Sequence, residues 1–134
     1  MLAFELQEML AHNRELISDT WYYFLTVHLA IFGIVHVASR RVSAFERLTL
    51  LFAYVGFLYV NYRSQADNYT LHNSITEEIR KLNESGEYRP LSYLLPTENS
   101  LWLATPENLT ALYLGVAALA AIIIFSTSWR RDTE

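Results

Sequence analysis

Two apolar runs without a single Asp, Glu, Lys or Arg most constrain how this chain can fold. They cover Trp21–Ala38 and Leu48–Tyr62, and a connector with three arginines separates them. A soluble helical hairpin of this length would carry charged side chains along one face, whereas transmembrane helices need no such face. The pattern therefore predicts two membrane-spanning helices that turn at the cytoplasmic surface.

A third uncharged run, Leu109–Ser128, follows a strong helix start signal. Thr105 supplies an N-cap, Pro106 suits the first helical position, and Glu107 places an acid in the first turn. We therefore expect an all-α membrane protein with three transmembrane helices, at about residues 21–38, 46–62 and 106–128.

The remaining segments are expected to complete a single integral membrane domain over residues 1–134. Residues 1–20 form an amphipathic segment that either lies in the headgroup region of the membrane or extends the first span outward. Residues 63–105 are expected to form a structured extracytoplasmic loop. Within it, Ser74-Ile-Thr-Glu77 matches a capping box and Gly86 a helix stop, which predicts a short separate helix.

Arginine placement predicts the orientation of the three spans. The connector holds Arg40 and Arg41, and the last span ends in an aromatic and basic anchor, Trp129-Arg130-Arg131. By the positive-inside rule both segments lie in the cytoplasm. We therefore expect a bacterial inner-membrane protein with its N-terminus outside and its C-terminus in the cytoplasm.

The composition argues against several functional classes. The chain has no Cys, which removes disulfide and thiolate chemistry, and its formal net charge is −4. Its basic residues are nowhere dense enough to indicate nucleic-acid binding. The sequence shows no nucleophile–base grouping, metal-ligand spacing or phosphate loop, so we expect a protein that is not an enzyme and needs no cofactor.

Two histidines in the first span, His28 and His36, are the most specific candidates for chemistry. Ionisable residues inside a membrane are costly and mark functional sites by default. They could bind haem or titrate with pH. The simpler alternative is a neutral histidine that is hydrogen-bonded to a neighbouring helix, and Tyr54, Tyr59, Asn61 and Tyr113 offer partners.

The third span carries small residues at helix-packing spacing. Ala111, Gly115 and Ala118 share one face, and Ala117 and Ala121 lie beside it. Small side chains allow helix backbones to approach closely, either within this chain or between chains. Because three short spans enclose no pore, the first functional hypothesis is a subunit or stabilising partner of a larger membrane complex.

Two alternatives stay open from the sequence. The first is a homo-oligomeric pore or membrane-permeabilising effector, in which His28, His36 and Asn61 would form the polar lining. Its layout of three spans with a basic cytoplasmic tail is similar to one class of phage holins, although no motif is shared. The second is a haem or metal anchor that uses His28 or His36.

Overall fold

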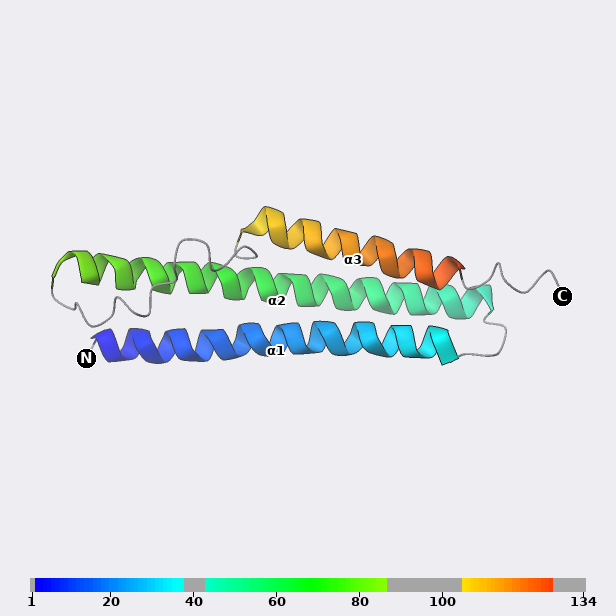
Figure 1. Cartoon of the computed structure of the whole chain (residues 1–134), viewed down its shortest axis with the longest axis horizontal. Coiled ribbons are helices and arrows are strands. Elements are labelled where there is room, and N and C mark those ends of the chain that lie inside the picture. The colour runs from blue at the N-terminus through cyan, green and yellow to red at the C-terminus, as the bar shows by residue number, and fades with distance from the viewer. Residues whose placement is uncertain (1, 38–42, 87–104, 127–134) are drawn as a thin grey trace.

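The computed structural model describes residues 2–37, 43–86 and 105–126, which form three helices. These are α1 (Leu2–Val37), α2 (Ala44–Glu84) and α3 (Pro106–Ser126). α1 and α2 lie side by side as an antiparallel hairpin, and α3 lies along the N-terminal half of α2 (Figure 1). The described ranges contain no strand, so the predicted all-α class is confirmed for them.

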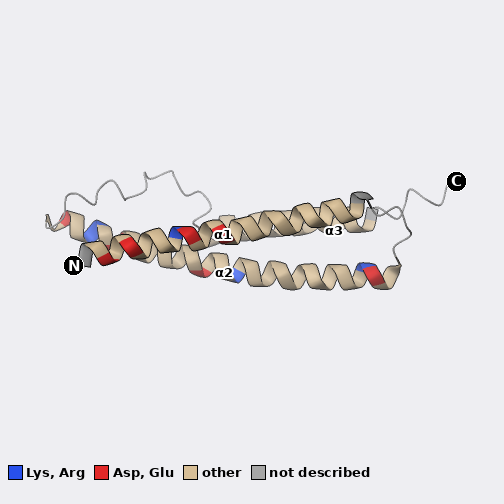
Figure 2. Ribbon diagram, turned by 90° about the horizontal axis from the view of Figure 1, so that it is seen from below, with Lys and Arg blue, Asp and Glu red and all other residues tan. Residues whose placement is uncertain are grey.

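Apart from Glu46, Arg47 and Glu107 at the starts of α2 and α3, the charged residues of the described helices lie at one end of the molecule, which divides it into two parts (Figure 2). The charge-free bundle comprises residues 20–37 of α1, 48–62 of α2 and 108–126 of α3, none of which is Asp, Glu, Lys or Arg. The stalk comprises residues 2–19 of α1 and 63–84 of α2. It holds eight acidic and four basic residues, a formal charge of −4. The stalk extends about 30 Å beyond the bundle, given 1.5 Å per helical residue.

The N-terminal segment is not a separate helix. α1 runs unbroken for 36 residues, so residues 2–20 extend the first apolar run outward. Of the two possibilities that the sequence left open for this segment, the structure shows the extension.

The short separate helix predicted at Ser74 is wrong. Its residues are helical, but as the last part of α2, which runs unbroken for 41 residues. The Ser74 hydroxyl donates to the carbonyl oxygen of Thr70 at 3.0 Å and caps nothing. Residues 63–73 contain no Pro or Gly that would end a helix, and they pack against α1. Residues 63–84 of the predicted loop are therefore helical.

The hairpin is held by inward positions that alternate three and four residues apart, the spacing of an α-helical coiled coil. On α1 these positions are Leu6, Leu10, Asn13, Ile17, Thr20, Phe24, Val27, Ile31 and Val35. On α2 they are Tyr54, Leu58, Asn61, Gln65, Asn68, His72, Ile75 and Ile79. The same repeat continues from the bundle into the stalk, although many of the stalk positions are polar.

The helix ends follow local signals. α2 begins with a capping box in which the Ser43 hydroxyl accepts from the backbone N–H of Glu46, and the Glu46 carboxylate accepts from that of Ser43. The predicted N-cap of α3 is confirmed, since the Thr105 hydroxyl accepts from the backbone N–H of Asn108 at 3.4 Å. Gly86, with φ of +77°, follows the end of α2 as predicted.

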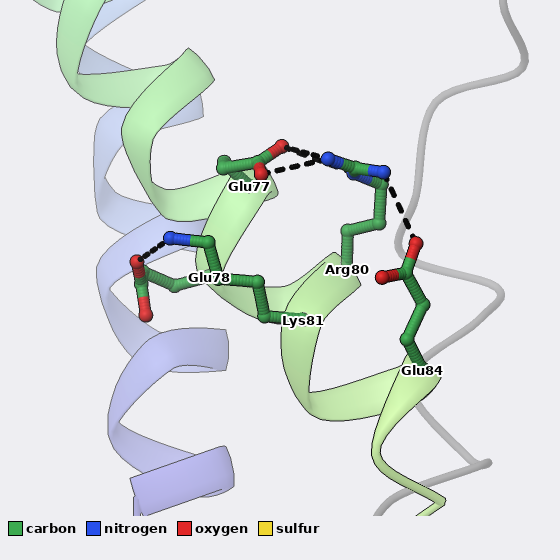
Figure 3. Close-up of polar contacts among 5 residues, drawn as sticks. All are labelled: Glu77, Glu78, Arg80, Lys81 and Glu84. Atoms are coloured by element: carbon green, nitrogen blue, oxygen red, sulfur yellow. Dashed lines mark hydrogen bonds and ion pairs between the residues drawn. The ribbon is translucent and has the colours of Figure 1, made fainter.

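Ion pairs within α2 stabilise the tip of the stalk (Figure 3). Arg80 binds the carboxylate of Glu77 at 2.7 Å and that of Glu84 at 3.0 Å, and Lys81 binds Glu78 at 2.8 Å. The hydrogen bond from Arg80 lowers the pKa of Glu77. These pairs join residues three or four apart on one helix, so they stabilise the last turns of α2 and do not contribute to its packing against α1.

Candidate functional site

The charge-free bundle keeps polar side chains in its interior. Thr20 and His28 of α1 and Asn61 of α2 are all buried, whereas the surrounding surface is apolar. Because a buried polar group without a partner is costly, each of these groups needs a hydrogen bond from within the bundle.

His28 forms two short hydrogen bonds. Its Nδ1 lies 2.6 Å from the carbonyl oxygen of Phe24, which can only accept, so Nδ1 carries a proton. Its Nε2 lies 2.7 Å from the hydroxyl oxygen of Tyr54 on α2. In the neutral ring Nε2 accepts from this hydroxyl. Of the alternatives considered for His28, this geometry matches the hydrogen-bonded one, and both ring nitrogens are engaged.

Asn61 connects all three helices. Its Nδ2 donates to the carbonyl oxygen of Thr20 on α1 at 3.1 Å. Its Oδ1 accepts a short hydrogen bond from the hydroxyl of Tyr113 on α3. One amide side chain therefore bonds to both neighbouring helices. We call the three residues Thr20, Asn61 and Tyr113 the Asn61 tie.

Aromatic contacts and a further hydrogen bond surround the Asn61 tie. The ring of Tyr113 lies 4.9 Å from that of Phe24 and 5.5 Å from that of Tyr62, measured between centroids. The hydroxyl of Thr110 donates to the carbonyl oxygen of Pro106, so it accepts from the hydroxyl of Tyr62 at 2.9 Å. α3 is thus attached near its first turns by specific polar contacts as well as by packing.

The outer surface of the charge-free bundle is apolar. Phe52 is 84% exposed, and large apolar side chains of all three helices are similarly uncovered. They include Leu25, Leu29, Val55, Val60, Leu114, Leu119 and Ile122. This apolar outer surface is the reverse of the polar surface of a water-soluble bundle, and it surrounds a core in which polar groups lie among apolar side chains such as Phe24 and Leu58.

α3 turns its larger side chains toward the hairpin. Leu109, Tyr113, Ala120 and Ile124 are buried, whereas Ala111, Gly115 and Ala118 are exposed and Ala121 is half-buried. A Cβ atom added at Gly115 would meet no atom within 4 Å. Of the small residues predicted for helix packing, Ala111, Gly115 and Ala118 are therefore turned away from the hairpin, whereas Ala121 is partly covered and Ala117 packs against the core.

Several residues singled out in the sequence lie outside the part of the chain that the structure describes. The side chain of His36 lies outside the described residues, as do Arg40, Arg41, Trp129, Arg130 and Arg131. In the ranges that the structure describes, no three His, Asp or Glu side chains are grouped so that they could hold a metal ion.

The sequence interpretation missed a second group of buried polar residues, in the stalk. Asn13 of α1 and Gln65 and His72 of α2 are buried, and their signal is the coiled-coil spacing that continues past residue 62. Asn13 Nδ2 donates to the backbone carbonyl oxygen of Asn68 at 3.0 Å. The side-chain amide of Gln65 and both ring nitrogens of His72 have no hydrogen-bond partner.

Among the described helices, one is long and apolar enough to cross a membrane by length and composition, namely α3 over Pro106–Phe125. Comparison with protein-family models, with curated proteins and with solved structures finds no match for this chain.

Proposed function

We propose that the chain is an integral membrane protein whose charge-free bundle spans the bilayer with three helices, and whose function is to associate with another membrane protein. The observation that carries this proposal is the uncovered surface of Leu, Val and Phe side chains around an interior that also holds His28 and Asn61. Eighteen residues of α1 cover about 27 Å, close to the thickness of a hydrocarbon core.

The arginine placement supports one orientation in a bacterial inner membrane. With the connector after α1 and the C-terminal tail in the cytoplasm, the stalk projects from the outer surface.

The exposed small-residue face of α3 supports association with a partner. Ala111, Gly115 and Ala118 lie on a helix that contacts the hairpin through its opposite side. In a bilayer, small residues that line one face allow close approach of another helix. We therefore infer a subunit or stabilising partner of a larger complex, which docks on this face of α3.

The two alternative functions are less well supported by the geometry. His28 and Asn61 point into the interior of a single chain, where they cannot line a channel between copies. A haem or metal anchor at His28 would require its Nε2 to leave the hydroxyl of Tyr54. Both alternatives would therefore need a rearranged bundle.

Chemical labelling tests whether lipid surrounds the charge-free bundle. Because the chain has no Cys, single cysteines can be placed at Phe52 in the bundle and at Ser74 in the stalk, both of which are exposed in the fold. In membranes, a water-soluble maleimide is expected to label Ser74→Cys and to leave Phe52→Cys unlabelled. Equal labelling of the two cysteines would contradict the membrane-spanning bundle.

A second experiment tests the docking face. Gly115→Leu is expected to reduce the amount of partner that co-purifies in mild detergent by about tenfold or more, equivalent to about 1.4 kcal/mol of binding free energy. The matched control is Gly56→Leu on α2, where an added Cβ likewise meets nothing within 4 Å. Both variants should fold, so only the substitution on the docking face should reduce the amount of co-purifying partner.

The mass of the purified complex identifies the partner. A stoichiometric foreign chain supports the subunit, and a mass that is a whole-number multiple of this chain indicates self-association. Retention of the partner by Gly115→Leu at the level of the control would contradict docking through this face of α3.

A further inference from the structure

His72 is a buried ionisable group in the core of the stalk. Its side chain is 4% exposed, and neither ring nitrogen has a hydrogen-bond partner. It occupies an inward position of the coiled-coil repeat, between Asn68 and Ile75 of α2 and against α1. A neutral imidazole is tolerated there, whereas a charged ring loses its solvation by water and neither of its N–H groups has an acceptor in this fold.

The charges around His72 oppose its protonation. Among the described residues α1 is the helix that packs against this part of α2, and its charged group close to His72 is Arg14. The acidic residues Glu8 and Glu15 and the imidazole of His12 lie on exposed faces of α1. Burial and then the positive charge of Arg14 hold the pKa of His72 below its usual value of 6.5.

The core around His72 is weakly held. The amide of Gln65, the Oδ1 atom of Asn13 and the hydroxyl of Thr76 are buried without partners. The apolar cluster of the stalk is small, consisting of Leu10, Ile75 and Ile79 with Leu6 beside them. Because unpaired polar groups gain hydrogen bonds to water when the helices part, a single added charge can decide whether the stalk stays closed.

We propose that His72 makes the stalk a pH-sensitive switch, in which the neutral ring keeps residues 2–19 and 63–84 paired and its protonation separates them. The charge-free bundle holds the two helices together at the base, so the separation begins at the tip. The proposal concerns the stalk alone and does not depend on the identity of any membrane partner.

The pH range of the switch follows from the lowered pKa of His72 in the closed stalk. A ring exposed in the open stalk binds a proton near pH 6.5, more readily than the buried ring of the closed stalk. Pairing of the helices is therefore fully stable above this pH and is lost as the pH falls below it. The ratio of open to closed stalks should rise by up to about tenfold per pH unit until the buried ring also titrates.

Distance measurements between spin labels test the proposal on the full chain in liposomes. The labels are placed at Ala11→Cys on α1 and Ser74→Cys on α2, two exposed neutral positions of the stalk. We expect one short distance at pH 8 and a growing population of longer distances between pH 6.5 and pH 5. In His72→Gln, which cannot become charged, the short distance should persist at pH 5.

Two controls keep the result specific. His12→Gln, on the exposed face of α1, should retain the full response to pH, and His72→Leu should remain closed throughout. Identical distance distributions at pH 8 and pH 5 in the unaltered stalk would overturn the proposal. An unchanged pH response in His72→Gln would overturn it as well, because another group would then be responsible.

Discussion

Replacing Asn61 by leucine is expected to lower the free energy of unfolding by about 1–3 kcal/mol, because the buried hydroxyl of Tyr113 loses its acceptor. Leucine is close to asparagine in size, so the loss comes mainly from hydrogen bonding. The hydroxyl then remains buried between α2 and α3 without its partner. Thermal unfolding in mild detergent, followed by circular dichroism, measures the change.

A double-mutant cycle separates the hydrogen bond from simple packing. Tyr113→Phe removes the donor and, combined with Asn61→Leu, leaves no unpaired hydroxyl. The double variant should therefore be more stable than Asn61→Leu alone, since removal of both partners costs less than removal of one. If the two substitutions are strictly additive, the Asn61 tie does not stabilise the bundle in the way described.

Replacing Ile79 by alanine is expected to destabilise the stalk by about 2–5 kcal/mol, the usual cost of this truncation in a packed core. Ile79 is completely buried and belongs to the small cluster with Leu10 and Ile75. Hydrogen exchange should show loss of protection in residues 2–19 and 63–84, while the charge-free bundle stays protected.

Leu71→Ala provides the matched control on the same helix. Leu71 is exposed, so its truncation removes little packing and should leave exchange in the stalk almost unchanged. A uniform loss of protection in both parts after Ile79→Ala would contradict this expectation, because it would show that stalk and bundle unfold as one unit.

The helices were predictable where local signals operate. Thr105-Pro106 and Gly86 act through their own backbone geometry, and the structure shows both the predicted N-cap and the predicted stop. The continuous course of α2 was not predictable in this way. Gln65 and His72 make the sequence after residue 62 resemble a polar loop, and their inward positions become evident only when α1 lies against them.

The sequence identified residues of the candidate site, but it did not determine which of them contact one another. His28 was recognised from the sequence with four possible partners, and the structure pairs it with one of them, Tyr54. For α3, spacing alone reveals a small-residue face and a large-residue face, but it cannot show which one meets the hairpin. Tyr113 resolves this, because its hydroxyl finds an acceptor in Asn61 on α2.

The unbroken course of α2 has a mechanical consequence. A continuous helix without proline has no hinge at the boundary between stalk and charge-free bundle, so a separation of the stalk helices must bend α2 smoothly or tilt it about this boundary. The arms on either side of this boundary are of similar length, about 30 Å each. When α2 tilts as a rigid body about this boundary, a sideways displacement of the stalk tip therefore moves the opposite end of the helix by a comparable distance in the opposite direction.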